Sequence, residues 1–279
     1  MSLKVSQIMA RSPKVFHVPS MTEDLVKFMI RNKITGAPIV NQDGKYAGMV
    51  SRRDIFSNPS EIQTAMIMRK DDPVSPDDDV QKAAKIMVSR GRRHIAVVDS
   101  SGKVAGILTP HSFLPVIQRE YSDVMVSRVM KRSSFALWEK MPARLFIKIA
   151  DLAQRYAFPV LDSEGNFMGI LTDRDVFNIV RFQSSEASMK GELSEDDPWS
   201  WEGVRNFTSY AVYKNILTVP DVTVENCMIR NPRAVDVEES LGTAAGIMLE
   251  NDFNQLPVLT GSKGLLGMIY DIDMIEVIY

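Results

Sequence analysis

Apolar positions along the chain predict a short helix followed by a hairpin, and this pattern occurs four times. Val80, Ala83, Ala84, Met87 and Val88 are spaced as one face of a helix. Similar spacing occurs at three other sets: Leu25, Val26, Met29 and Ile30; Ala143, Phe146, Ile147 and Ala150; and Leu241, Ala244, Ala245, Met248 and Leu249. After each set, two apolar runs flank a glycine-containing turn such as N-Q-D-G-K or D-S-S-G-K, which is a strong hairpin signal.

These elements belong to an internal repeat whose register is set by Met9, Met68, Met130 and Met228. Strands begin 28 or 29 residues later, at Pro38, Ala96, Pro159 and Pro257. Ten residues further on, at Gly48, Gly106, Gly169 and Gly267, four related phrases begin: G-M-V-S-R-R-D, G-I-L-T-P-H-S, G-I-L-T-D-R-D and G-M-I-Y-D-I-D. A second helix is expected directly after each phrase, so the unit is β-α-β-β-α.

A single unit of this size can hardly bury enough apolar surface by itself, so we expect the units to pair. The fold class is α/β (α+β), with units 1 and 2 forming one packed pair and units 3 and 4 another. The expected boundaries are 5–58, 64–118, 126–181 and 223–279.

The segment 182–222 interrupts the repeat between units 3 and 4. It is polar and acidic until Trp199 and Trp201, and we interpret it as a solvated loop with two anchoring tryptophans. The alternative is a lid or a segment that docks a partner, because long loops in compact domains are often functional.

Composition and charge narrow the classes of protein. The 279 residues carry a net charge of −2, which argues against a broad nucleic-acid surface. The single cysteine, Cys227, cannot form an internal disulfide and fits a buried structural thiol in a reducing compartment. The N-terminus does not resemble a secretory signal, and no apolar stretch approaches the ~20 residues of a membrane span. We therefore expect a cytoplasmic protein that does not enter membranes.

The repeated phrase has a structural interpretation. A Ser or Thr followed three residues later by an acid, just after a strand, is a helix capping box. Ser51 with Asp54, and Thr172 with Asp175, would each form such a cap, which contributes on the order of 1 kcal/mol.

The same geometry also suits a ligand. A helix N-terminus favours anions, and a carboxylate beside it can accept hydrogen bonds from ribose hydroxyls. Arg52, Arg53 and Arg174 add positive charge that capping does not require. The run R-G-R-R-H at 90–94 precedes a strand of unit 2, and it is either a solvated loop or part of the same ligand-facing region.

Four units of this kind, with a leading Ile-Met or Val-Met, a Gly-Ala-Pro-Ile-Val strand and a closing Gly-h-h-Ser/Thr-x-x-Asp, resemble the cystathionine β-synthase (CBS) domain family. The resemblance covers nearly the whole chain outside the insertion. Four consecutive units also resemble the gamma subunit of AMP-activated protein kinase and its archaeal relatives. The resemblance implies that units pair through their sheets into Bateman modules with two clefts each, and that two modules often form a disk.

The resemblance also implies a ligand and the residues that bind it. Many family members bind AMP, ADP, ATP or S-adenosylmethionine between paired units. By position, the ribose-binding carboxylates are Asp54 and Asp175, with Ser51 and Thr172 near the ribose and phosphate. The residues expected to clasp the base are Ile34, Thr35 and Ala37 in unit 1 and Tyr156, Ala157 and Phe158 in unit 3. The expected phosphate contacts are Arg93 and His94, in reversed order relative to gamma subunits, and the set is completed by Arg52, Arg53, Asp173 and Arg174.

Two units depart from this pattern. Unit 2 has Ser112 where the ribose-binding Asp belongs, and unit 4 keeps Asp273 but carries Tyr270, whose bulk could fill its cleft. We therefore expect one competent ligand site in each module, at units 1 and 3.

The sequence offers no catalytic constellation. His17, His94 and His111 lie in three separate segments without metal-ligand spacing, and no phosphate-binding loop of the G-x-x-x-x-G-K-[ST] type occurs. We expect a non-enzymatic sensor, without a catalytic cofactor, that relays ligand occupancy to a protein partner or within a homodimer. The alternative is a structural scaffold without a regulatory ligand, and nucleic-acid binding is the least favoured class.

Overall fold

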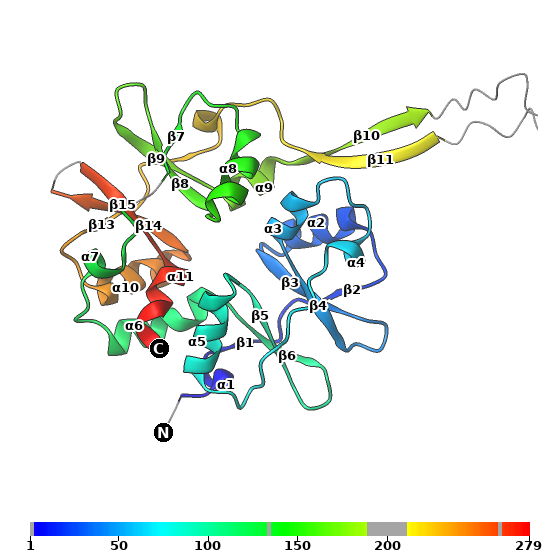
Figure 1. Cartoon of the computed structure of the whole chain (residues 1–279), viewed down its shortest axis with the longest axis horizontal. Coiled ribbons are helices and arrows are strands. Elements are labelled where there is room, and N and C mark those ends of the chain that lie inside the picture. The colour runs from blue at the N-terminus through cyan, green and yellow to red at the C-terminus, as the bar shows by residue number, and fades with distance from the viewer. Residues whose placement is uncertain (1–2, 133–134, 189–210, 262–263) are drawn as a thin grey trace, which may run out of the picture.

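The four units, repeats 1 to 4, occupy four quadrants of a ring in the order 1, 2, 4, 3, as the computed structural model shows (Figure 1). The structure describes residues 3–132, 135–188, 211–261 and 264–279. None of the helices in this part of the chain has the length and apolar composition that a membrane span requires.

The first module consists of repeats 1 and 2. Repeat 1 contains α1 (Val5–Ile8), β1 (Ala10–Arg11), β2 (Phe16–His17), α2 (Thr22–Arg31), β3 (Gly36–Val40), β4 (Tyr46–Ser51) and α3 (Arg52–Ser57). Repeat 2 contains α4 (Thr64–Ile67), α5 (Val80–Ser89), β5 (Ile95–Val98), β6 (Val104–Leu108), the 3₁₀ helix η1 (Pro110–Phe113) and α6 (Leu114–Glu120).

The second module consists of repeats 3 and 4. Repeat 3 contains α7 (Val126–Val129), β7 (Leu137–Trp138), α8 (Leu145–Ala153), β8 (Ala157–Leu161), β9 (Phe167–Thr172) and α9 (Asp173–Ile179). Repeat 4 contains η2 (Val224–Asn226), β12 (Ile229–Arg230), β13 (Val235–Asp236), α10 (Leu241–Asn251), β14 (Gln255–Thr260), β15 (Gly264–Tyr270), α11 (Asp271–Met274) and η3 (Ile275–Ile278). The expected four-fold fold is confirmed.

Within each module, the start of one repeat lies against the sheet of the other. β1 of repeat 1 pairs antiparallel with β6 of repeat 2, and β12 of repeat 4 pairs antiparallel with β9 of repeat 3. In the reverse direction, Arg69 bridges to Met49, and Lys131 bridges to Met268. These exchanges join repeat 1 to repeat 2 and repeat 3 to repeat 4.

The crossing segments explain why every phrase opens with glycine. A Cβ atom at Gly48, Gly169 or Gly267 would overlap the backbone carbonyl oxygen of the segment that crosses over it. At Gly106 it would collide with the Met9 side chain. Glycine at these positions is therefore required by the close approach of two backbones.

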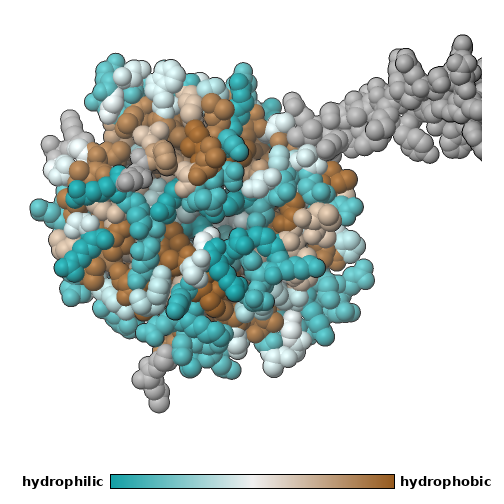
Figure 2. Space-filling view, in the orientation of Figure 1, coloured by the Kyte–Doolittle hydropathy of each residue, from teal (hydrophilic) through white to brown (hydrophobic). Residues whose placement is uncertain are grey.

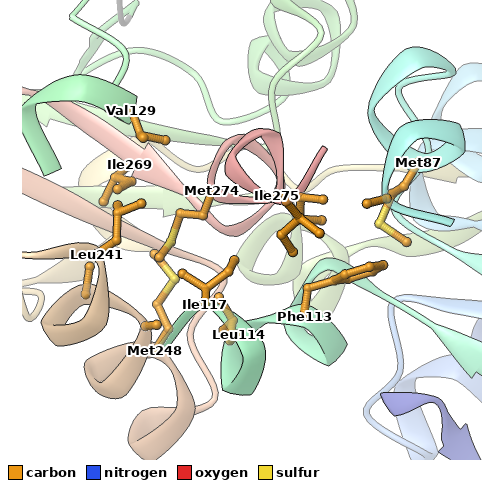
Figure 3. Packing of buried hydrophobic residues seen from close by; sticks show 14 of the residues in the cluster. Met87, Phe113, Leu114, Ile117, Val129, Leu241, Met248, Ile269, Met274 and Ile275 are labelled. Carbon is orange, nitrogen blue, oxygen red and sulfur yellow. The ribbon is translucent and has the colours of Figure 1, made fainter. Parts of the chain in front are cut away.

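The modules join each other through their helices. One apolar cluster combines the helices of repeats 2 and 4, and Figure 3 shows its members from α5, α6, α10 and α11 in direct contact. A second cluster combines repeats 1 and 3 and includes Phe56, Phe146 and Phe177. The predicted helical faces of α5 and α10 are buried except for Val88 and Leu249, which are half-buried.

Two of the helix predictions were wrong in part. Ile30 on α2 is 40% exposed, although it was expected on the buried face. In α8 only Phe146 is fully buried, while Ile147 and Ala150 border a cavity. The helical period was right, but Ile30 is exposed, and Ile147 and Ala150 are half-buried at the edge of the apolar cluster.

We expected the insertion to be a loop, but both of its ends form strands. β10 (Arg181–Ser188) and β11 (Ala211–Thr218) pair antiparallel from Arg181↔Thr218 to Ser188↔Ala211, and together they project away from the ring (Figure 1). The backbone N–H of Leu217 donates to the carbonyl of Pro59, so the base of this arm also contacts repeat 1. Trp199 and Trp201, the expected anchors, lie outside the described residues.

Candidate ligand site between the modules

A cavity of about 550 Å³ lies where repeats 1 and 3 face each other, with further walls from repeat 2, β11 and Asn254 of repeat 4. Nine of the expected site residues line it: Thr35, Ser51, Arg52, Arg53, Asp54, Arg93, His94, Tyr156 and Asp173. Seven do not: Ile34, Ala37, Ala157, Phe158, Thr172, Arg174 and Asp175. Hydrophilic side chains gather at the centre of the ring on the face shown in Figure 2.

The repeat 1 phrase faces the cavity and also caps its helix. The Ser51 backbone N–H and hydroxyl donate to Oδ2 of Asp54, at 2.7 and 2.6 Å. Oδ1 of Asp54 lies 2.8 Å from Nε of Arg69, which comes from the segment that crosses over β4. Because one carboxylate oxygen caps the helix and the other faces an arginine, the cap interpretation and the ligand interpretation are compatible here.

The repeat 3 phrase forms the same cap without facing the cavity. The Thr172 N–H and hydroxyl donate to Oδ2 of Asp175, at 2.9 and 2.6 Å. Burial raises the pKa of Asp175, against the effect of these hydrogen bonds. Of this phrase only Asp173 lines the cavity, while Arg174 lies 3.7 Å from Asp252 outside it. Cys227 nearby is half-buried, although a buried thiol was expected, and this burial raises the pKa of its thiol to about 11.

The groove between β15 of repeat 4 and β8 of repeat 3 is filled by Tyr270. Its ring is 2% exposed and lies 5.5 Å from the ring of Tyr156, edge to face. Its hydroxyl donates to the carbonyl of Ala157 at 2.8 Å, so an atom expected to clasp a base is already hydrogen-bonded. Phe158 is packed in the core. The side chain at 270 therefore takes the place that Ser51 leaves open in repeat 1.

The base-clasping residues of repeat 1 are divided between the cavity and the core. The Thr35 hydroxyl is hydrogen-bonded to Nε2 of His94, with 2.6 Å between the two atoms, and the Thr35 carbonyl accepts from the N–H of Arg52. Ala37 is fully buried and Ile34 packs against the apolar core. Thr35 is thus the one member of this set that lines the cavity.

His94 lies at the cavity wall as a neutral side chain. It is 5% exposed, and burial together with Arg93, Arg69 and Arg52 lowers its pKa to about 3. Because a charged imidazole is disfavoured there, His94 does not add to the positive charge of the cavity. The neighbouring Arg93 keeps its charge.

Arg93 connects the two modules through a buried carboxylate. Its two terminal nitrogens donate to the two oxygens of Asp271 at 2.7 and 2.9 Å, and its guanidinium lies 3.9 Å from the ring centroid of Tyr156. The Tyr156 hydroxyl donates to the same carboxylate at 2.9 Å. Burial opposes the charge of Arg93, but the charge and hydrogen bonds of Asp271 together with Tyr156 outweigh it, so the pKa of Arg93 is raised. Asp271 was missed by the sequence analysis because its partners lie in repeats 2 and 3.

Two further ion pairs join different repeats. Arg52 lies 3.4 Å from Asp173, which joins repeats 1 and 3. Arg155 of repeat 3 lies 3.1 Å from Asp273 of repeat 4. Asp273, which holds the position of the ribose-binding carboxylate in repeat 4, is therefore paired with an arginine, and Tyr270 occupies the space beside it.

Positive side chains outnumber carboxylates along the cavity wall, but all of them except Arg53 form ion pairs with carboxylates of the described residues. Eight lining residues are positively charged: Arg52, Arg53, Arg69, Arg92, Arg93, Arg144, Arg155 and Lys148. Three are carboxylates: Asp54, Asp151 and Asp173. Apolar side chains of Phe56, Phe146 and Leu217 also line the cavity. Arg69, Arg144, Lys148 and Arg155 were not predicted from the sequence, and Arg92 was noted only as part of the run at 90–94.

The chain belongs to the CBS domain family. The model of the CBS domain matches residues 5–61, 64–119, 126–181 and 224–279, which is most of the chain.

Two relatives are proteins of Methanocaldococcus jannaschii. Protein MJ1404 of Methanocaldococcus jannaschii is 26% identical over 82% of this chain and half of its own length, and MJ1225 of the same organism is 24% identical over 55% of this chain and 61% of its own length. The chain thus spans between half and two thirds of these relatives. The crystal structure of MJ1225, described as a candidate archaeal homologue of g-AMPK, has a TM-score of 0.77 over 99% of this chain and 100% of that chain at 16% identity. The structure of a conserved protein from Pyrococcus horikoshii has a TM-score of 0.65 at 27% identity, with 99% and 100% covered.

Proposed function

We propose that this protein is a non-catalytic regulator that binds one adenosine-containing ligand in the cavity beside the repeat 1 phrase and relays its occupancy to a protein partner. The observation that carries the proposal is the contrast between two grooves. Ser51 and Asp54 border a cavity large enough for a nucleotide, whereas Tyr270 fills the groove at the corresponding phrase of repeat 4.

The proposal differs from the sequence-based expectation in the number of sites. The sequence favoured one site per module, at repeats 1 and 3. Asp175 does not line the cavity, and its carboxylate is held by the Thr172 cap. We therefore keep Asp54 as the ribose-binding carboxylate and assign Asp175 a capping role.

The proposal also includes a regulatory role, a cytoplasmic location and a change of shape on binding. CBS domains and the overall likeness to MJ1225 support a regulatory role, and we place the protein in the cytoplasm. A change of shape on binding requires that the ligand favours one arrangement of the modules. The cavity lies between the modules, so its occupant contacts both.

A scaffold remains the second candidate, because ion pairs across repeat boundaries hold the ring together without a ligand. Calorimetry with AMP, ATP and S-adenosylmethionine, on protein refolded free of co-purified ligand, separates the two. Heat with at least one of them supports the sensor, and no heat with any of them supports the scaffold.

A matched pair of variants tests the site. Asp54→Asn is expected to weaken binding at least tenfold, because it removes the charge of an acceptor for the ribose hydroxyls. Asp175→Asn changes the same residue type in the same cap and is expected to leave the affinity unchanged. Equal losses in both variants would contradict the assignment of a single site.

A further inference from the structure

The arm formed by β10 and β11 differs from the hairpins of the four repeats in its strand edges. In every repeat, a short strand or a bridge lies beside each edge of the hairpin. β1 and β12 pair with β6 and β9, and Arg69 and Lys131 bridge to β4 and β15. The other strand of each hairpin is flanked by β2, β7, β13 or the bridge of Val74. Within the described residues, β10 and β11 pair only with each other, so both edges of the arm are open.

A contact with repeat 1 shows which backbone groups of β11 point away from β10. Leu217 is part of the pairing with β10, yet its N–H donates to the carbonyl of Pro59 at 3.0 Å. Backbone groups of an antiparallel strand alternate between its two sides. The N–H and C=O groups of Ala211, Tyr213 and Asn215 therefore lie along the same outer edge as the N–H of Leu217.

This outer edge of β11 is suited to pair with another strand. The pairing of the arm runs from Arg181↔Thr218 to Ser188↔Ala211, and the arm projects away from the ring (Figure 1). A two-stranded hairpin is only marginally stable by itself in water, and an unpaired edge can pair with a further chain. β11, A-V-Y-K-N-I-L-T, contains several residues that favour strands, whereas β10, R-F-Q-S-S-E-A-S, is mostly small and polar. The edge of β11 is therefore the stronger candidate of the two.

The outer edge of β11 is complementary to a second copy of itself. A two-fold axis at Tyr213 would place two copies of β11 antiparallel, with Tyr213 opposite the second copy's Tyr213 and Ala211 opposite the second copy's Asn215. All the residues with outward backbone groups would then form hydrogen-bonded pairs, and each such pair exchanges two hydrogen bonds. In this register Lys214 lies opposite the second copy's Val212, so like charges are not directly opposite each other.

We infer that the outer edge of β11 docks the arm of a second copy of this chain, and that the two arms form a four-stranded sheet in the order β10-β11-β11-β10. A two-fold contact of this kind uses the same edge from both copies, so it joins two chains and no more. Leu217, at the base of this edge, also lines the cavity between repeats 1 and 3. The contact between copies therefore begins beside the cavity wall, but it does not depend on a ligand in the cavity.

The test is the oligomeric state of the full chain, measured by sedimentation over a range of protein concentrations. The chain is expected to form dimers. Asn215→Pro removes an outward N–H and places proline in what becomes a central strand, so it should weaken the dimer at least tenfold. Ser184→Pro is the matched control, because Ser184 lies opposite Asn215 and its N–H points to the other edge of the arm. It should leave the dimer unchanged.

A second pair of variants does not involve proline. Tyr213→Cys should form a disulfide between two copies on mild oxidation, because the two-fold axis places the Cα atoms of both copies about 5.5 Å apart. Glu186→Cys should not form one, since Glu186 lies opposite Tyr213 at the other edge of the arm. Both variants keep Cys227, so a disulfide through that thiol would appear equally in both.

The outcomes decide the inference without reference to the adenosine site, which is tested by ligand calorimetry. A chain that stays monomeric at every concentration overturns it. A dimer that survives Asn215→Pro and forms no disulfide at position 213 also overturns it, because the copies then meet elsewhere. If both proline variants weaken the dimer equally, the disulfide decides: its formation in Tyr213→Cys supports the edge, and its absence overturns the inference.

Discussion

The two boundaries between the modules are built from equivalent elements and have opposite character. Between repeats 2 and 4, α6 and α10 pack against each other around an apolar core (Figure 3). Between repeats 1 and 3, α3 and α8 border a cationic cavity. In the register of the repeat, Gly242 and Gly246 of α10 correspond to Arg144 and Lys148 of repeat 3, so small residues stand at the first boundary where long cationic side chains line the cavity at the second. A repeat protein can thus close one boundary with apolar side chains and leave a cavity at the other.

The ion pairs at the two boundaries also differ in burial and geometry. Arg93–Asp271, between repeats 2 and 4, is bidentate, and the carboxylate is 0% exposed. Arg52–Asp173, between repeats 1 and 3, is a single contact of 3.4 Å to a carboxylate that is 27% exposed. We call the boundary between repeats 2 and 4 the closed boundary and the one between repeats 1 and 3 the open boundary. We expect the closed boundary to depend on its ion pair more than the open boundary does.

The largest expected effect comes from breaking the closed ion pair. Arg93→Met should destabilise the protein by about 3–5 kcal/mol, because it leaves Asp271 buried and without its cation. Arg52→Met should cost only about 1 kcal/mol, since Asp173 can be hydrated and the remaining cations repel one another less. Urea unfolding of both variants measures the difference, and similar losses would show that the two boundaries are equally dependent on their ion pairs.

The next effect concerns apolar packing. Met248→Ala in α10 should cost about 3 kcal/mol, because Met248 is fully buried in the core of repeats 2 and 4. Ile147→Ala in α8 should cost about 1 kcal/mol or less, because Ile147 is half-buried at the cavity wall and its removal leaves little new void. If Ile147→Ala proved the more destabilising, the boundary of repeats 1 and 3 would be closed in solution.

A smaller effect, visible only as a pH dependence, tests His94 at the open boundary. Its pKa is lowered to about 3 in the folded protein, against about 6.5 when unfolded, so the unfolded chain binds more protons between these values. The His94 contribution is therefore present above pH 6.5 and is lost as pH falls, by roughly 2 kcal/mol at pH 5. His94→Gln can still bond Thr35 and should lack this loss. Asp175 and Asp273, whose pKa values are raised, act in the opposite direction but equally in both proteins. Parallel stability curves for both proteins from pH 7 to pH 5 would show that His94 is not held neutral.

Much of the fold could be predicted from periodicity. The helical spacing at Val80–Met87 and Leu241–Met248, the glycine turns and the four phrases identify β-α-β-β-α units, because these signals are local in the chain. The capping boxes at Ser51 and Thr172 were also readable, since each needs only residues three apart. β10 was missed because its sequence, R-F-Q-S-S-E-A-S, has no apolar alternation to indicate a strand. β11, A-V-Y-K-N-I-L-T, carries apolar residues that could have indicated one.

The candidate site was predictable only in part. Asp54, Arg52 and Arg93 were found because they occupy marked positions in the repeat. Asp271 and Arg155 were missed, since their importance comes from partners more than a hundred residues away. The sequence favoured Asp175 equally with Asp54, and no local signal distinguishes the two.

By itself, the sequence determined that the chain consists of four CBS repeats, where each begins, and which phrase closes each sheet. The bulk of Tyr270 was already readable from the sequence. Only the tertiary structure decided that glycines at 242 and 246 lie in the closed boundary and that arginines from three repeats converge on the other. The physical reason is that secondary structure follows from neighbours along the chain, whereas space and charge in a cavity depend on which distant surfaces are brought together.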